Sequence, residues 1–214
     1  MLQKFLKHEK GITGLETAII LIAFVVVAAV FAYTALSAGL FATQKSQEAV
    51  YSGLKEAQST LELRGSVVAT ANSTGSSGTV KQITFTVANV LGGDAIDFTV
   101  PTASSDNTGV AASGSINKVV INYLDQDQTV NDLYWTVTKL GTDDGDDLLE
   151  TNEKFEITVG SSTSSSGGGN LINALTTDLT VNKTFTLQVV TPAGAVLQIE
   201  RTMPAYIDTI MNLH

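Results

Sequence analysis

Residues 10–42 read KGITGLETAIILIAFVVVAAVFAYTALSAGLFA, and residues 18–42 within this stretch carry no charge. As a helix rising about 1.5 Å per residue, residues 18–42 measure roughly 37 Å. The hydrocarbon core of a bilayer is about 30 Å thick, so this run is long enough to cross one. Lys4, Lys7 and Lys10 precede the run. Because basic flanks stay in the cytoplasm, they orient the rest of the chain outward. The stretch therefore predicts an apolar N-terminal helix.

The composition of the whole chain excludes several classes of function. Its 214 residues carry a net charge of −9, include no cysteine, and contain only the histidines His8 and His214. Binding to nucleic acid requires clustered Lys and Arg, which an acidic chain does not supply. Thiol chemistry and thiolate zinc sites lack their cysteines, and a Ser-His-Asp triad could draw only on two histidines near the termini. We therefore expect neither catalysis nor a nucleic-acid partner.

The sequence after residue 64 changes from helical periodicity to short β-type segments. Several segments alternate polar with apolar residues and are separated by Gly, Ser, Asn and Asp clusters, which is typical of strands with one buried face. These segments are residues 79–88, 117–124, 133–140, 154–159, 179–190 and 196–201. We predict an α+β chain with a long N-terminal hydrophobic α-helix, followed by an antiparallel Ig-like β-sandwich head over residues 65–214. Residues 203–214 fit either a closing strand or a contact segment.

Large aromatic side chains in the predicted strands indicate where the core of the head lies. Such residues are more often buried core than ligand-stacking platforms. The predicted core aromatics are Phe85, Phe98, Trp135, Phe155 and Phe185.

Residues 43–64 extend the predicted helix with a more polar composition. Val50, Leu54, Ala57 and Leu61 recur at helical spacing and form one apolar stripe. Gly65 is of the type that ends helices. We therefore predict one helix over residues 12–64.

The N-terminal motif admits three interpretations. A secretory signal has a shorter apolar region that is followed by its cleavage site, whereas a plain membrane anchor would keep its basic leader. The third interpretation uses more residues: Lys10-Gly11-Ile12, then Glu16, then a long apolar run. This arrangement resembles the class III signal of type IV pilin-like subunits, and it is most similar to that of archaeal flagellins (archaellins).

The resemblance implies both a maturation step and a function. A prepilin-type membrane peptidase would cut after Gly11, remove residues 1–11 and leave Ile12 as the new N-terminus. The chain would pass through the membrane, and an assembly ATPase and platform would extract it into a surface filament outside the cell. Such a filament is a polymer of this chain, alone or with paralogous subunits, and rotates for swimming. An archaeal adhesion pilin and a membrane-anchored β-sandwich binding protein are the alternatives.

Glu16 is the only acid near the apolar run and has two readings. A carboxylate in lipid or in a dry core needs a cationic partner, and the new α-amino group of Ile12 in an adjacent subunit would supply one. That pairing would set the axial register of assembly. Alternatively, Glu16 is an acid at a helix N-terminus, favoured by the helix dipole.

A second cluster of acids lies between predicted strands, in the sequence GTDDGDDLLETNEKF. Crowded carboxylates repel unless a cation neutralises them, and hard oxygen ligands suit Ca²⁺ or Mg²⁺. The spacing departs from the EF-hand pattern, because Thr151 stands where that pattern requires an acid. A bound cation and a solvated loop remain the two readings. The candidate ligands are Asp143, Asp144, Asp146, Asp147 and Glu150.

Two N-x-[ST] sequons are candidate sites of N-glycosylation on an exported chain: Asn72-Ser73-Thr74 and Asn182-Lys183-Thr184. Asn72 lies in a Ser/Gly-rich segment and is expected in a loop. Asn182 is expected within a strand. On this reading Asn72 is the better acceptor.

Overall fold

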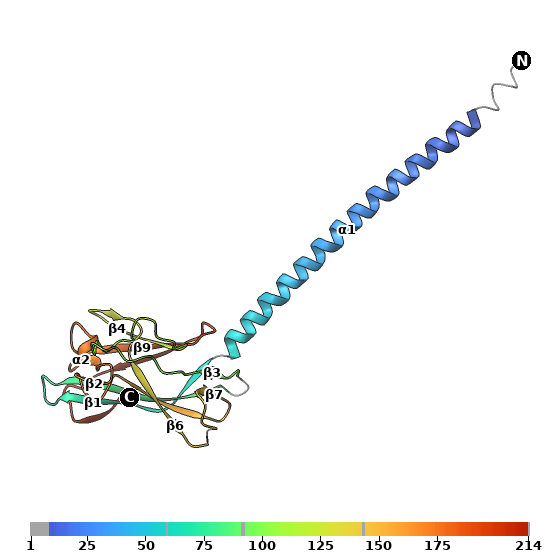
Figure 1. Ribbon diagram of the computed structural model, residues 1–214. Helices are drawn as coiled ribbons and strands as arrows, with labels where there is room; N and C mark the ends of the chain where they lie inside the picture. The colour runs from blue at the N-terminus through green and yellow to red at the C-terminus, as the bar shows by residue number, and fades with distance from the viewer. Residues whose placement is uncertain (1–8, 59, 91–92, 143, 214) are drawn as a thin grey trace, which may run out of the picture. The chain divides into compact units, whose positions relative to one another are not determined.

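The computed structural model describes residues 9–58, 60–90, 93–142 and 144–213 (Figure 1). Side chains are described from Gly14 onward. The chain divides into two compact units, Met1–Ser52 and Gly53–His214. The first unit is most of a long helix. The second unit contains the last turns of that helix and the β-rich head.

Helix α1 covers Glu9–Gln58, which confirms the predicted long helix but not its predicted end at Arg64. Leu61 is buried in the core of the head, and Leu61 to Arg64 pair with strand β2. Sheet hydrogen bonds thus replace helical ones, and the stripe position assigned to Leu61 belongs to the head. Gly65 does not cap the helix. It has φ +82° beside an irregularity of the β1–β2 ladder, where the left-handed conformation favours glycine.

The head is built from short strands and one short helix. Its elements are β1 (Leu61–Ser73), β2 (Thr79–Asn89), β3 (Ile96–Asp97), β4 (Val120–Asp125), β5 (Thr129–Val130), β6 (Trp135–Leu140), β7 (Leu148–Leu149), β8 (Lys154–Val159), α2 (Leu171–Ala174), β9 (Thr184–Val190), β10 (Val196–Thr202) and β11 (Ile210–Leu213). Each of the six predicted strands contains or overlaps one of these strands.

The strands form two main antiparallel sheets, in agreement with the predicted fold class. One sheet has the order β11-β1-β2-β8-β6 and the other has the order β10-β9-β4-β5, while β3 and β7 form a small additional pair. The C-terminal segment supplies the closing strand β11, which pairs with β1 from Val67↔Leu213 to Thr70↔Ile210. The last strand of the chain therefore lies beside the first strand of the head.

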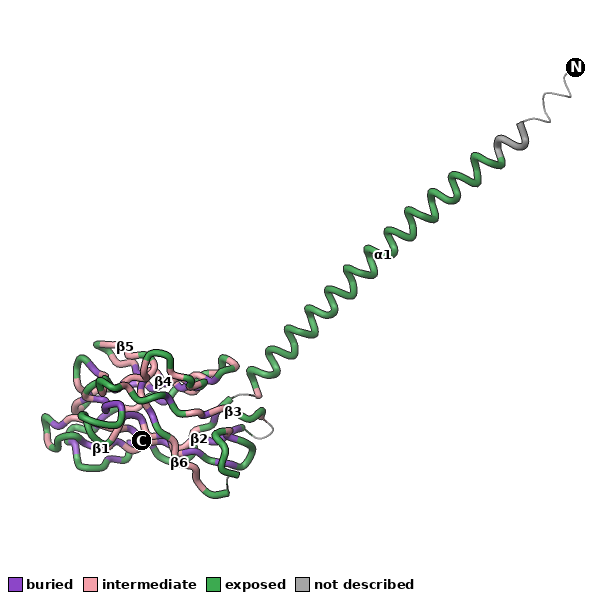
Figure 2. The backbone as a smooth tube through the Cα atoms, in the orientation of Figure 1, coloured by how far each residue is buried: buried purple, intermediate pink, exposed green. Residues whose placement is uncertain are grey.

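The core of the head lies between the two sheets, where alternate strand residues are buried (Figure 2). All five predicted core aromatics are buried, each with at most 1% of its surface exposed. The ring of Phe98 meets Trp135 edge-on at 5.9 Å and Phe155 edge-on at 5.8 Å between centroids. Tyr123 and Phe185 stack at 6.0 Å. These contacts join residues from distant parts of the sequence, so the core defines the fold of the head.

Candidate assembly interface

The apolar side chains of α1 are uncovered in the single chain. Every residue from Gly14 to Ala57 is exposed, in contrast to the buried segments of the head (Figure 2). Phe24 keeps 71% of its surface exposed and Phe31 keeps 68%. A helix that is apolar on all sides is normally surrounded by other protein or by lipid. The uncovered helix therefore requires either protein or lipid around it.

The length and composition of α1 also allow it to cross a membrane. An 18-residue window within Gly14–Gln58 reaches a mean hydropathy of 2.8. By length and composition alone, this helix meets the requirement for a membrane span. Lipid and neighbouring helices are thus both physically suitable surroundings for it.

Threonines in the apolar part of α1 satisfy their hydroxyl groups within the helix. Thr34 donates to the carbonyl oxygen of Phe31 at 2.9 Å, and Thr43 donates to that of Leu40 at 2.9 Å. Thr17 donates to Gly14 O at 3.0 Å. Hydroxyl groups bonded in this way can enter an apolar environment at lower cost than unpaired ones.

The predicted cleavage motif lies at the start of α1. The backbone of Lys10, Gly11 and Ile12 is helical in the uncleaved chain, while their side chains lie outside the described part. Residues 1–8 of the predicted leader also lie outside it. Glu16 is exposed on the helix about one turn after Ile12. Cleavage after Gly11 and pairing of Glu16 with the new amino group both stay predictions.

The acidic loop is organised by a lysine that sequence analysis did not include. Lys139 of β6 lies 3.1 Å from the Asp147 carboxylate and donates to the carbonyl oxygen of Gly145 at 2.9 Å. Asp144 and Asp146 accept from the backbone N–H groups of Asp146 and Leu148, at 3.2 and 2.8 Å.

Two candidate ligands remain. The backbone N–H of Glu150 donates to the carboxylate of Glu153 at 3.0 Å. Asp143 lies outside the described residues. Within the described part of the chain, no group of three or more His, Cys, Asp or Glu side chains could hold a metal ion. The metal site therefore stays a prediction.

The two sequons exchange their expected settings. Asn72 is exposed but lies within β1, where its amide donates to Thr79 Oγ1 at 3.3 Å. Asn182 is exposed in a turn before β9 and has φ +55°. The predicted strand over residues 179–190 begins only at Thr184, because Asn182 adopts a left-handed turn. The loop expected at Asn72 and the strand expected at Asn182 are thus both wrong.

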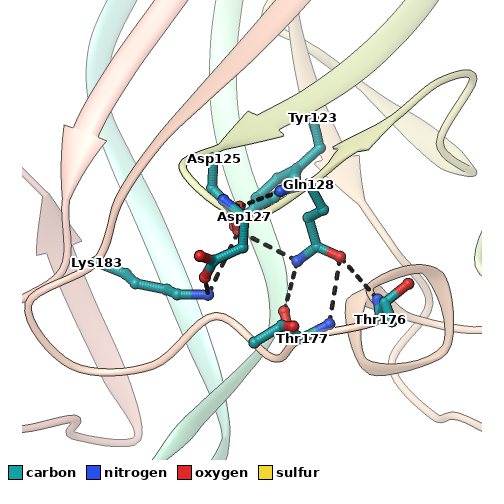
Figure 3. A network of polar contacts seen from close by, with 7 residues as sticks. All are labelled: Tyr123, Asp125, Asp127, Gln128, Thr176, Thr177 and Lys183. Carbon is teal, nitrogen blue, oxygen red and sulfur yellow. Dashed lines mark hydrogen bonds and ion pairs between the residues drawn. The ribbon is translucent and has the colours of Figure 1, made fainter.

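A polar network beside the turn of Asn182 was missed in the sequence (Figure 3). Asp125, at the end of β4, accepts from the Tyr123 phenol at 2.8 Å and from the backbone N–H groups of Asp127 and Gln128 at 2.7 and 2.9 Å. Lys183 lies 2.7 Å from the carboxylate of Asp127. The turn sequence DQDQ carried a local signal, since Asp often bonds the backbone two residues ahead.

Gln128 extends this network to the segment after α2. Its side-chain oxygen accepts from the backbone N–H of Thr176 at 2.8 Å, and its amide donates to Thr177 O at 2.6 Å. The network therefore joins the β4–β5 turn, the segment after α2 and the turn before β9. Its groups bond one another, which indicates a structural role in holding these three segments of the head together.

Ionisation of the network follows from its contacts. Burial raises the pKa of Asp125, but hydrogen bonds from Asp127 N–H, Gln128 and Tyr123 outweigh burial and hold this pKa below its usual value. Burial, together with the Asp125 carboxylate, raises the pKa of Tyr123 far above its usual value. Burial lowers the pKa of Lys183, but Asp127 and Asp125 reverse this effect and leave it raised. At neutral pH, Asp125 and Lys183 are charged and Tyr123 is neutral.

The head has a shallow pocket of about 320 Å³ that is lined by Arg64, Ala88, Asn89 and Thr151 to Lys154. Arg64 is paired with Glu62 at 2.8 Å on the exposed surface.

The fold and the uncovered helix define a class of protein, an assembly subunit. Its head folds around its own core, and its apolar helix is buried in protein only when subunits pack together. Residues 11–201 match the family model of archaeal-type flagellin. The chain belongs to the archaeal-type flagellin family.

Known relatives agree with this assignment over the whole chain. The chain is 40% identical to Probable flagellin 1 of Archaeoglobus fulgidus, over 98% of each sequence. It is similar to a chain from the archaeal flagellum of Methanospirillum hungatei, with a TM-score of 0.61 and 29% identity over 94% of this chain and 98% of that one.

The crystal structure of flagellin FlaB1 from Methanocaldococcus jannaschii shares the fold, with a TM-score of 0.51 and 12% identity over 72% of this chain and 96% of that one. Together with family membership, the likeness to the flagellum structure gives the chain a structural role in a filament.

Proposed function

We propose that this chain polymerises through α1 into the filament of an archaeal flagellum, alone or with paralogous subunits, and that the filament rotates for swimming. The observation that carries this proposal is the uncovered apolar surface of α1 from Gly14 onward. Packing helices against one another would bury that surface, at about 25 cal/mol for each Å² of apolar area removed from water. The β heads would form the outside of the filament, and the chain would carry out no catalysis.

Maturation and export complete the proposed function. A prepilin-type peptidase removes residues 1–11 by cutting between Gly11 and Ile12. The apolar helix then rests in the membrane until an assembly ATPase and its platform extract the subunit to the cell surface. Glu16 pairs with the amino group of Ile12 in a neighbouring subunit. The motif Lys10-Gly11-Ile12 and the position of Glu16 at the start of α1 support this scheme.

One preparation tests the proposal. Filaments are sheared from cells, and the N-terminus and intact mass of their subunits are measured by mass spectrometry. A chain that begins at Ile12 within filaments is the expected result. A chain that begins at Met1, found in membranes and absent from filaments, would overturn it in favour of an anchored binding protein. Deletion of the gene should abolish swimming, whereas loss of surface attachment alone would indicate an adhesion pilin.

We also propose N-glycosylation at the sequons, with Asn182 the better acceptor and Asn72 the poorer. Asn182 lies exposed in a turn, whereas the Asn72 backbone is part of a sheet. Peptide mass spectrometry of the same filaments should find the larger occupancy at Asn182. An unmodified Asn182 peptide beside a modified Asn72 peptide would reverse the order.

The acidic loop is retained as a proposed Ca²⁺ or Mg²⁺ site made of Asp143, Asp144, Asp146, Asp147 and Glu150. The crowding of carboxylates within a few residues supports it. Lys139 already neutralises Asp147, so a cation would compete with it. Removal of divalent ions by EDTA should lower the melting temperature of the filament protein, and adding back Ca²⁺ or Mg²⁺ should restore it. An unchanged melting temperature contradicts the site.

A further inference from the structure

Three polar side chains in the apolar part of α1 have no bonding partner within their own helix. Between Thr17 and Gln44, the polar side chains are those of Thr17, Tyr33, Thr34, Ser37, Thr43 and Gln44. The three threonines donate to backbone carbonyl groups of the helix. Within the described part of the chain, the side chains of Tyr33, Ser37 and Gln44 form no hydrogen bond, although their backbones are bonded in the helix. Once α1 is covered, the threonine hydroxyls keep their partners, whereas the side chains of Tyr33, Ser37 and Gln44 need partners from outside the helix.

The three unbonded groups lie on one face. At about 100° per residue, Tyr33, Ser37 and Gln44 fall within an arc of roughly 40°, while the threonines lie outside that arc by roughly 60° or more. Along the axis they span about 16 Å. The same face has a shallow groove of about 290 Å³, lined by Tyr33, Leu36, Ser37, Leu40, Phe41 and Gln44. We call Tyr33, Ser37 and Gln44 the polar face of α1.

Covering this face changes the energetics of its polar groups. A hydroxyl or amide that is moved from water into an apolar environment is strongly disfavoured unless it finds a hydrogen-bond partner. Lipid chains supply none, and neighbouring helices supply partners only where their own polar groups lie. Each group of the polar face is both a donor and an acceptor. A second copy of the same face can therefore satisfy it.

We propose that the polar face of α1 contacts the polar faces of other copies of this chain, and so points toward the axis of the filament. This inference rests on the proposed filament function. In a helical array of parallel helices, equivalent sides of all copies converge only around the axis. A self-complementary face is satisfied there. The resulting hydrogen bonds fix the relative height of neighbouring helices, which purely apolar contacts do not do.

The first test compares polar-to-apolar substitutions in filaments of the full chain: Tyr33→Phe, Ser37→Ala and Gln44→Met. Thr34→Val is the matched control, because its hydroxyl is bonded within the helix. Each test variant should release more soluble subunit at a given temperature than wild type, by about fivefold to thirtyfold for a loss of one to two interhelical bonds. The control should stay within about twofold. Test variants that are unchanged or more stable would overturn the inference, since removal of an unpaired buried polar group stabilises.

The second test uses the absence of native cysteine. Filaments of Ser37→Cys and of Ala35→Cys are treated with a short bifunctional maleimide, because Ala35 lies on the opposite side of the helix. Ser37→Cys should give covalent dimers and higher species, while Ala35→Cys should stay monomeric. Equal coupling, or coupling at Ala35 alone, contradicts an axial polar face.

The same preparations separate failure of this inference from failure of the proposed function. Absence of the wild-type chain from filaments would refute the proposed function, and this inference with it. Wild-type filaments whose stability and coupling do not depend on the polar face would refute the inference alone. Circular dichroism of each variant in detergent confirms that the head has kept its β structure.

Discussion

The carboxylate of Asp125, whose side chain has no exposed surface, lies 3.7 Å from the ammonium group of Lys183. The same lysine lies 2.7 Å from the half-exposed Asp127. One cation thus connects a buried and a half-exposed acid of the same turn. The contributions of the two acids to stability should differ accordingly.

Replacement of Asp125 should destabilise the head strongly. Asp125→Asn removes the buried negative charge and disturbs the bonds to Tyr123 and the turn backbone, so the expected loss of unfolding free energy is about 3–5 kcal/mol. Asp127→Asn is the matched control, with an expected loss of about 0–1 kcal/mol because its carboxylate is half exposed. Denaturant titration of the detergent-solubilised chain measures both. Equal losses would show that burial of Asp125 is not the deciding factor.

The Asp125 network should make the head sensitive to acid. The pKa of Asp125 is lower in the folded chain than in the unfolded one, so the unfolded chain binds the extra proton. The stabilisation is complete above the unfolded pKa of about 3.9, and it is lost as the pH falls through the lower folded value. Thermal melting between pH 7 and pH 2 should show this loss. In Asp125→Asn the melting temperature should fall less steeply with decreasing pH, because this residue no longer takes up a proton on unfolding.

Alkaline conditions should weaken the same region. Lys183 and Tyr123 both have raised pKa values, so the folded chain holds protons that the unfolded chain releases. Their stabilisation is complete below about pH 10, and it decreases as the pH rises beyond the unfolded pKa values. Melting measured from pH 8 to pH 12 should show a decrease that is smaller in Lys183→Met. If the melting temperature of Lys183→Met falls as much as that of wild type, the alkaline destabilisation comes from groups other than Lys183.

Gly93 should not tolerate a side chain. A Cβ at this position would overlap the carbonyl oxygen of Gln58 at the end of α1 and the side-chain oxygen of Asn89. Gly93→Ala should therefore cost about 1–3 kcal/mol. Gly53→Ala is the contrasting change, because a Cβ in that helical position meets nothing within 4 Å, and it should stabilise by about 0.5–1 kcal/mol. Denaturant unfolding of both variants in detergent measures whether the unfolding free energy falls in Gly93→Ala and rises in Gly53→Ala.

The aromatic contacts of Phe98 should be a large part of the stability of the head. Phe98→Ala removes edge-on contacts with Trp135 and Phe155 and leaves a cavity, with an expected loss of about 3–5 kcal/mol. Val100→Ala, at a side chain that is 42% exposed, should change stability by less than about 1 kcal/mol. The same denaturant titration distinguishes the two variants. A small effect of Phe98→Ala would mean that the core closes around the cavity.

Local sequence patterns predicted the elements whose signal is long and periodic. The apolar run specified α1, and β8 lies where alternation placed it, at Lys154–Val159. The end of the helix was predicted wrongly because Leu61 continues the helical stripe, while its burial depends on partners in β2 that lie far along the chain. The two-residue strands β3, β5 and β7 are too short to show a period.

The site predictions divide in the same way. The exposed apolar surface of α1 follows directly from composition. The left-handed turn at Asn182 and the burial of Asp125 depend on segments brought together by the fold, so the local sequence around each residue was insufficient. The polar face of α1 could have been read from the spacing of Tyr33, Ser37 and Gln44. Its significance required the knowledge that the nearby threonine hydroxyls are bonded within the helix.

The pairing of β11 with β1 also imposes an order of events during synthesis. The first sheet of the head gains its edge strand only when residues 210–213 have left the ribosome, whereas α1 emerges complete before any strand of the head. The apolar helix is therefore fully synthesised while the head still lacks its last strand. A chain that ended before residue 210 would keep the whole of α1 but would leave β1 unpaired from Val67 to Thr70, so the last residues of the chain complete the first sheet of the head.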